Sequence, residues 1–289
     1  MVTDVTRRRL NYFVDRDVEV TRLLNFVADG GDRVMTVCGS AGLGKSLLME
    51  KMIHECANRK WRTSKVICRD TRNDPLFIMR TIRDDLGVES FSAFTALVNA
   101  ATQPPEPNIH IAVNAPVSVG NGAQVSGTAG DISGIKIVSD LMLDRPDLAR
   151  REREQLARIT DAFIGGLTCC SRVEPPIIFI DDCQKMTGET KTWLAQELLF
   201  AVNEGIVGNA FFVLFTRESC HVPLQPASCL TELKPLTKDH IRQYLAKRGV
   251  RESDQELMAR VLWTVTKGQT AAVANYVEAY LVQESELAS

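Results

Sequence analysis

Apolar residues recur along the chain with two spacings in turn, one typical of buried strands and one typical of amphipathic helices. Short apolar runs predict strands at residues 34–38, 65–69, 177–180, 210–215 and 230–233. Helical stripes lie between them, and their apolar members are Val20, Leu23, Leu24 and Val27, then Leu48, Met52 and Cys56, then Leu156, Ile159, Phe163 and Leu167. Pro75 is typical of the first turn of one more helix, which runs toward Gly87. This alternation predicts the α/β class, with a parallel sheet and crossover helices.

Residues 103–138 depart from this alternation and predict a small β-rich insertion. Apolar and polar positions alternate there with a period of two, and the apolar set is Ile109, Ile111, Val113, Val117 and Val119. Glycines divide the remainder into short pieces. A hairpin of this kind has an edge that needs a cover. The cover is either the hairpin's own domain or another protein, as an oligomer or effector contact.

The last part of the chain, residues 233–289, predicts a bundle of three helices that follows a core of residues 1–232. Thr237 is a suitable N-cap for the first helix, which is expected to stop at Gly249. Ser253 and Glu256 form a capping-box pattern at the start of the second helix. The third helix carries an apolar stripe made of Ala274, Val277 and Leu281.

Composition fits a globular protein with one large α/β domain and a small helical one, because 45% of the 289 residues are hydrophobic. The formal charge of −2 lacks the basic excess typical of proteins that bind mainly nucleic-acid phosphates. No apolar run approaches membrane-spanning length and no secretory signal opens the sequence, so we expect a cytoplasmic protein without a membrane partner. The eight cysteines include no C-x-x-C pair, which predicts reduced thiols, with Cys38, Cys68 and Cys183 in or beside strands, rather than zinc ligands.

The loop after the first predicted strand carries the complete phosphate-binding sequence G-x-x-x-x-G-K-[ST], which consists of Gly39, Ser40, Ala41, Gly42, Leu43, Gly44, Lys45 and Ser46 and is followed by Leu47. The glycines let backbone N–H groups curve around phosphate oxygens, and a helix that begins at Ser46 directs its N-terminus at the same anion. In this interpretation Lys45 reaches the β- and γ-phosphates, and the Ser46 hydroxyl binds Mg²⁺. The alternative is a glycine-rich turn with an incidental lysine, but the order strand, loop, helix favours a site for ATP or ADP.

Two further strands end in polar residues at the edge of the sheet where ligands of open α/β sheets bind. We expect Asp181 to hold Mg²⁺, directly or through water, and Asp182 to orient or deprotonate the attacking water. Arg217 follows the next strand and is suited to sense or neutralise the γ-phosphate, since a guanidinium matches phosphate oxygens with a fixed fork of donors. The alternative for Arg217 is a surface position on a loop. The catalytic candidates are therefore Lys45, Asp182 and Arg217.

Together these motifs resemble the AAA+ and STAND families of P-loop ATPases, especially the branch shared by replication initiators, NACHT or NB-ARC switches and bacterial signalling ATPases. Residues 13–17 are similar to the family's F-V-G-R-E motif, which implies that Val14 and Arg16 lie against the adenine, although Asp15 replaces the motif's glycine and Asp17 its glutamate. The resemblance implies a P-loop NTPase fold, a three-layer αβα arrangement whose C-terminal helical lid closes over the nucleotide.

Other family motifs are altered in ways that bear on hydrolysis. The Asp181-Asp182 pair is similar to that of STAND proteins, whereas AAA+ hydrolases carry Asp-Glu, and Thr216-Arg217 resembles sensor 1. Gly268-Gln269-Thr270 lacks the proline of the G-x-P motif, no sensor 2 arginine stands there, and Lys267 is the substitute candidate. Arg217 is also the only arginine between Thr216 and the strand at residues 230–233, where AAA+ rings place their arginine finger, so a dedicated finger is missing. We therefore expect slow hydrolysis.

Two classes of function fit these observations. The first is an ATP-dependent switch whose nucleotide state controls self-assembly, as a homo-oligomer, or a separate effector protein. The second is a nucleic-acid-associated AAA+ regulator of the replication-initiator or transposition type. Nucleic acid is the less favoured partner, because we expect no winged helix after the lid. A P-loop metabolite kinase is disfavoured by the sensor strand and the lid.

Overall fold

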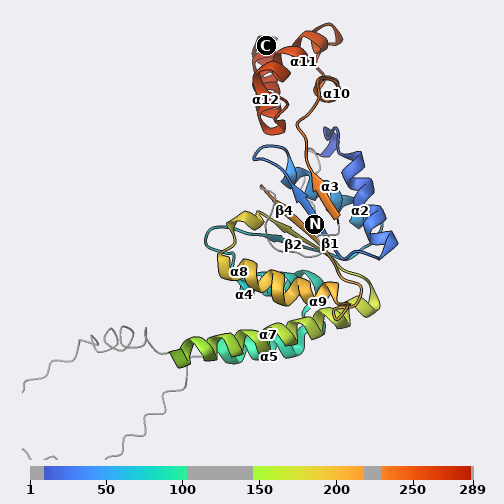
Figure 1. Cartoon of the computed structure of the whole chain (residues 1–289). Helices are drawn as coiled ribbons and strands as arrows, with labels where there is room; N and C mark the ends of the chain where they lie inside the picture. Colours follow the sequence, from blue (N-terminus) through green and yellow to red (C-terminus); the bar gives the residue numbers. More distant parts are fainter. Residues whose placement is uncertain (1–9, 103–145, 218–228, 288–289) are drawn as a thin grey trace, which may run out of the picture.

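A computed structural model describes residues 10–102, 146–217 and 229–287, and its centre is a five-stranded parallel sheet (Figure 1). The strands are β1 (Val34–Cys38), β2 (Thr63–Ile67), β3 (Ile177–Asp181), β4 (Phe211–Thr216) and β5 (Cys229–Glu232). They lie in the order β2-β3-β4-β1-β5, and each neighbouring pair is parallel. All five strands therefore end at the same edge, and β1 lies in the interior of the sheet, between β4 and β5.

The pleat of the sheet divides its apolar side chains between two cores. On one face, Met35, Val37, Phe179 and Val213 pack against α2 (Asp17–Asp29) and α3 (Lys45–Asn58). On the other face, residues one position along the same strands, among them Val34, Ile178, Ile180, Phe212 and Leu214, pack against the helices of the opposite layer. Because successive strand residues point to opposite faces, each apolar run serves both cores. The αβα three-layer prediction is confirmed.

The helical layer on the second face of the sheet contains several elements that the sequence pattern did not predict. It contains α4 (Pro75–Leu86), α5 (Ser92–Thr102), α7 (Pro146–Val173) and, after β3, α8 (Gly188–Trp193), the π-helical segment η3 (Leu194–Leu199) and α9 (Phe200–Asn203). The short 3₁₀ turns η1 (Val88–Phe91) and η2 (Cys183–Lys185) connect these elements. The sequence pattern predicted α4 and α7, but it did not predict α5 or the helical turns at residues 188–203.

Three phenylalanines hold α5 and η1 against α7. The rings of Phe91 and Phe163 stack with centroids 5.4 Å apart, and Phe94 meets Phe163 edge-on at 5.5 Å. A Cβ atom at Gly166 would lie 2.4 Å from the Phe91 ring, so this glycine permits the close approach of α7. In Figure 1, α5 and α7 run together on the side of the sheet remote from the C-terminal helices.

The C-terminal helices α10 (Lys238–Lys247), α11 (Glu252–Thr266) and α12 (Thr270–Leu287) bury a separate apolar cluster that includes Leu236, Ile241, Leu245, Leu262 and Val277. Thr237 caps α10 as predicted, because its hydroxyl accepts from the His240 N–H at 3.3 Å. The capping box at Ser253 is wrong. Helix α11 already begins at Glu252, so the Ser253 hydroxyl lies in its first turn and donates to Asp254 instead.

Some predicted boundaries shift. The strand predicted at residues 65–69 runs from Thr63 to Ile67, because its ladder with β3 opens opposite Ile177. Arg69 instead forms an isolated antiparallel bridge with Arg72. The β4 strand lies one residue later than predicted, β5 one residue earlier, and α3 begins one residue earlier, at Lys45.

The β-rich insertion predicted at residues 103–138 lies outside the described ranges. The six cysteines whose side chains are described form no disulfide, and Cys38, Cys68 and Cys183 are buried as expected. Among the described helices, none is both long and apolar enough to cross a bilayer.

Candidate functional site

The loop between β1 and α3 has the backbone shape of an anion cradle. Gly42 and Gly44 have φ values of 80° and 85°, in the left-handed region that favours glycine, and Gly44 is the N-cap of α3. The Gly39 N–H donates to the Thr216 carbonyl of β4 at 3.3 Å, which fixes the start of the loop against the neighbouring strand. The free N–H groups of the first turn of α3 and the positive end of its dipole therefore face one region beside the sheet edge.

Lys45 is buried in this loop and donates from Nζ to the carbonyls of Gly39 at 2.6 Å and Ser40 at 3.0 Å. Burial lowers the pKa of Lys45, the Asp181 carboxylate opposes this, and Arg217 adds to the lowering through charge repulsion. The two cations Lys45 and Arg217 thus act on the same small volume at the ends of β1 and β4. A polyanion in that volume would relieve the repulsion between them.

Ser46 and Asp181 form a pair of oxygen ligands suited to Mg²⁺. The Ser46 hydroxyl donates to Asp181 Oδ2 at 2.6 Å, and Asp181 is buried at the end of β3. Hydroxyl and carboxylate oxygens in direct contact are the donor set expected for a hard divalent cation beside a phosphate chain. The residues present fit that ion, which would be held by Ser46 and Asp181.

Asp182 follows in a left-handed conformation, with φ of 57°. Its Oδ1 accepts from Gln184 Nε2 at 2.6 Å, and its Oδ2 pairs with Lys185 Nζ at 3.1 Å. The other end of the Gln184 amide, Oε1, accepts from the backbone N–H of Arg217 at 3.1 Å. The structure therefore brings Asp182 and Arg217 together through Gln184, a residue that belongs to none of the sequence motifs.

A cavity of about 420 Å³ opens beside the loop, within the size range of small-molecule sites. Six of the residues proposed from sequence line it, namely Val14, Arg16, Leu43, Gly44, Ser46 and Leu47. The others, Gly39, Ser40, Ala41, Gly42, Lys45, Asp181, Asp182 and Arg217, do not line it. Instead, they belong to the loop and to the strand ends beyond Ser46.

The remaining walls of the cavity come from Tyr12, Phe13 and the C-terminal helices, including Tyr244, Arg248, Thr270 and Glu278. Arg248 lies over the Tyr12 ring, 4.4 Å from its centroid, and donates to Glu278 at 2.8 Å. Arg248 Nε and Thr270 Oγ1 are buried and have no hydrogen-bond partner among the described residues. Buried polar atoms without a partner are costly, so two of them in one cavity indicate a polar ligand.

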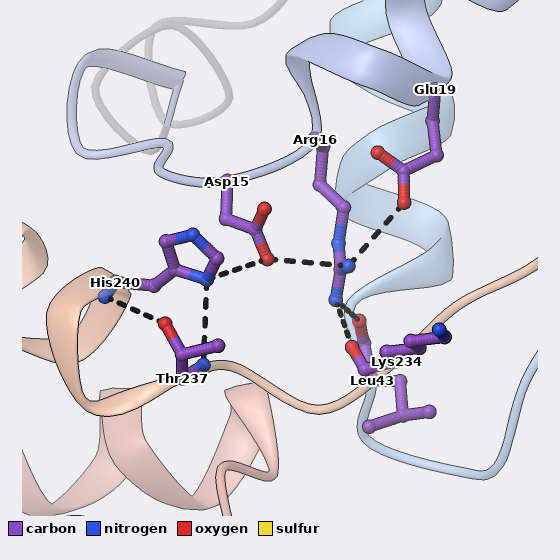
Figure 2. A network of polar contacts seen from close by, with 7 residues as sticks. All are labelled: Asp15, Arg16, Glu19, Leu43, Lys234, Thr237 and His240. Atoms are coloured by element: carbon purple, nitrogen blue, oxygen red, sulfur yellow. Dashed lines mark hydrogen bonds and ion pairs between the residues drawn. The ribbon is translucent and has the colours of Figure 1, made fainter.

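Arg16 links the N-terminal segment, the loop and the C-terminal helices (Figure 2). This side chain, 6% exposed, donates to the carbonyls of Lys234 at 2.7 Å and Leu43 at 3.4 Å. It also pairs with Glu19 and Asp15, both at 3.4 Å, and Asp15 reaches His240 of α10 at 3.0 Å. The backbone at Asp15 and Arg16 has positive φ, 52° and 148°, so these contacts hold a strained turn in place.

The start of α12 rests directly on the loop. The Ala271 N–H donates to the Gly42 carbonyl at 2.8 Å, and Gln269 Nε2 donates to the Ala41 carbonyl at 2.9 Å. A Cβ atom at Gly42 would lie 3.0 Å from the Gln269 side chain. A ligand that moved the loop would therefore also displace the N-terminus of α12, through these two hydrogen bonds.

No protein-family model matches the sequence, and no curated protein does. Among solved structures, Cdc6p of Pyrobaculum aerophilum superposes with a TM-score of 0.52 at 14% identity, over 94% of this chain and 63% of that one. The two chains therefore share a fold, the α/β arrangement of P-loop NTPases around a parallel sheet. The STAND protein with a tetratricopeptide repeat sensor from Pyrococcus horikoshii superposes with a TM-score of 0.46 at 14% identity, over 89% of this chain and 28% of that one. The Aeropyrum pernix Orc1 protein, solved in complex with DNA, matches with 0.48 at 11% identity, over 95% and 61%.

The chain spans less than two thirds of the length of each of these three proteins. The cavity residues that come from the C-terminal helices belong to no sequence motif, so they could not be recognised individually. A signal for one of them was present, because Ala274 lies on the predicted apolar stripe of α12, but the stripe does not distinguish a core position from a cavity wall.

Proposed function

We propose that the chain binds ATP with Mg²⁺, hydrolyses it slowly and uses the nucleotide state to set the position of its helical lid, and thereby controls self-assembly or a separate effector protein. The observation that supports this most is the shared cavity. One wall is the segment from Tyr12 to Arg16, another is the phosphate-binding loop, and the third is the lid formed by α10 and α12. A ligand in this cavity contacts both domains at once.

In this proposal the triphosphate lies on the N–H groups of the loop, with Lys45 turned from its carbonyl partners toward the β- and γ-phosphates. The base and ribose occupy the cavity between Val14 and α12. Mg²⁺ held by Ser46 and Asp181 would neutralise charge that develops on the phosphates.

Hydrolysis would be an attack of water on the γ-phosphorus. The bond between that phosphorus and the oxygen bridging to the β-phosphate breaks, which gives ADP and inorganic phosphate. Asp182 would orient the water and take its proton, and Arg217 would stabilise the charge on the transferred group. Asp182 is one methylene shorter than the glutamate of AAA+ hydrolases, and the sequence lacks a dedicated arginine finger between Arg217 and the strand at residues 230–233. Both points support a rate below about 1 s⁻¹, the lower end of ordinary enzyme turnover.

The link from nucleotide to lid rests on the contacts of α12 and Arg16. A phosphate chain that reshapes the loop would change the positions of the Ala41 and Gly42 carbonyls. These carbonyls accept hydrogen bonds from Gln269 and Ala271 of the lid. Such a change alters the relative stability of two lid positions, which is what a ligand-driven switch requires.

Binding is tested first, by calorimetric titration of ATP and ADP into protein freed of carried-over nucleotide. We expect Kd values in the micromolar range or below for wild type and loss of binding in Lys45→Ala, with Lys60→Ala, an exposed lysine of the same charge, as the control. Absence of uptake by wild type, or uptake unaffected by Lys45→Ala, contradicts the nucleotide site.

The switch is tested by mass in solution, measured by light scattering with ADP, with ATP and with a non-hydrolysable analogue. We expect the mass, or the capture of an added effector, to differ between ADP and the analogue. The Asp182→Asn variant with ATP should behave like wild type with the analogue, because it binds without turnover. A mass that is the same in all three states contradicts the switch but leaves nucleotide binding intact.

A further inference from the structure

Both carboxylate oxygens of Asp182 are engaged by side chains of the turn that follows it. Gln184 Nε2 donates to Oδ1 at 2.6 Å, and Lys185 Nζ lies 3.1 Å from Oδ2. The donors lie two and three residues along the chain, in η2, so the contacts depend on a single tight turn. The backbone of that turn is closed by the Lys185 N–H, which donates to the Asp182 carbonyl at 2.8 Å.

The turn is also anchored from outside. Asn73 Nδ2 donates to the Lys185 carbonyl at 2.7 Å, and the Arg217 N–H donates to Gln184 Oε1 at 3.1 Å. The Lys185 ammonium is thus presented to Asp182 by a turn that is tied both to the loop after β2 and to the end of β4. Two anchors on separate elements make the contact a built feature of the sheet edge rather than a chance surface pair.

We propose that Lys185 is a positioning residue that restrains the Asp182 carboxylate through their ion pair and so keeps ATP hydrolysis slow. This inference rests on the proposed function, in which Asp182 acts on the attacking water. A carboxylate that orients or deprotonates the attacking water must have an oxygen within hydrogen-bond distance of that water, on the side that faces the γ-phosphate. The ion pair turns Oδ2 toward η2 instead, and that rotation has to be undone before the water can be oriented.

The restraint is moderate in strength, because the pair is partly exposed. The side chain of Lys185 is 31% exposed and that of Asp182 is 23% exposed. A pair of this kind slows a step that must break it by about two- to fivefold. It can therefore be overcome by a partner protein or a lid movement that offers Lys185 another anion.

The test is the steady-state kinetics of phosphate release by the full chain, with a separate ATP titration for each variant. Lys185→Met should raise kcat about two- to fivefold and leave KM and the ATP Kd unchanged, because the lysine contacts neither the loop nor the cavity. Lys185→Arg, which keeps the cation, should retain the slow rate. The matched control is Lys191→Met, which removes a lysine that contacts the Gln184 carbonyl at 3.5 Å but not Asp182.

A double variant shows whether the effect passes through Asp182. Asp182→Asn in the Lys185→Met background should lose the entire gain. The proposal is overturned if Lys185→Met has an unchanged or lower kcat while ATP affinity is kept, or if the gain survives Asp182→Asn. Should the methionine variant lose thermal stability, Lys185→Gln takes its place and the same outcomes apply. If the wild type binds no ATP in the titration, the proposed function itself is wrong. If it binds ATP but Lys185→Met shows no gain in kcat, only the role of Lys185 is wrong.

Discussion

Replacement of Arg16 by methionine separates the lid contacts of this side chain from its packing. Methionine is a flexible, unbranched side chain that can occupy the buried volume but cannot donate to the carbonyls of Lys234 and Leu43. The loss includes one charge-assisted hydrogen bond of good length, to Lys234 at 2.7 Å, and weaker contacts at 3.4 Å to Leu43, Asp15 and Glu19.

The expected cost follows from those contacts. Of these contacts, only the bond to the Lys234 carbonyl joins Arg16 to the C-terminal segment, because Asp15, Glu19 and Leu43 lie within residues 1–232. A hydrogen bond to a charged donor contributes about 1.5–3 kcal/mol, so we expect about 2 kcal/mol less stability for the closed lid. Since about 1.4 kcal/mol is tenfold in an equilibrium, lid opening becomes roughly 30-fold more populated.

Amide hydrogen exchange measures this opening directly. The Ala271 N–H, which donates to Gly42 across the interface, should exchange roughly 30-fold faster in Arg16→Met, while the amides of β1 and β4 keep their protection. Arg22→Met is the matched control, because Arg22 donates to Leu230 and Thr231 of β5 and does not touch the lid. Equal protection at Ala271 in both variants would refute the role assigned to Arg16.

Three further changes test separate parts of the structure. Gly268→Ala should lower the melting temperature by several degrees and loosen the lid, because φ is +75° there and a Cβ atom would lie 2.1 Å from the Leu236 carbonyl oxygen; differential scanning calorimetry measures it. Iodoacetamide at pH 8 should label exposed Cys169 well before Cys56 and Cys68, because burial raises the pKa of both buried thiols to about 12. Their reactive thiolate forms only as the pH approaches that value, and peptide mass mapping at timed intervals detects the order of labelling. Asp181→Asn should weaken the Mg²⁺ dependence of ATP binding while metal-free binding persists, as seen by titration with and without EDTA.

The parts of the site that the sequence predicted are those built from neighbouring residues. The loop from Gly39 to Ser46 combines a strand, a glycine-rich turn and a helix start within a few positions, so local chemistry specifies it. The acids at the end of β3 were recognisable for the same reason, because an apolar run buried on both faces leads directly into Asp181 and Asp182.

What the sequence could not predict depends on tertiary contacts. The β2 strand begins at Thr63, two residues before its apolar run was assigned, because pairing with β3 decides the boundary and buried Ser64 is satisfied by Asp85 at 2.9 Å. Lys185 and Arg248 were missed in the same way. A lysine in a turn and an arginine at a helix end are ordinary in sequence, and only the folded chain brings them to Asp182 and to the cavity.

The end of the paired helices α5 and α7 is a suitable position for an inserted reporter. Helix α7 has 28 residues, so it is about 42 Å long, and it runs beside α5 away from the lid (Figure 1). The connection between them leaves at Thr102 and returns at Pro146, at the end of the pair that bears Ala101 and Arg151 in one shallow groove. A reporter or a foreign module grafted at that junction would sit on the side of the sheet remote from the C-terminal helices (Figure 1).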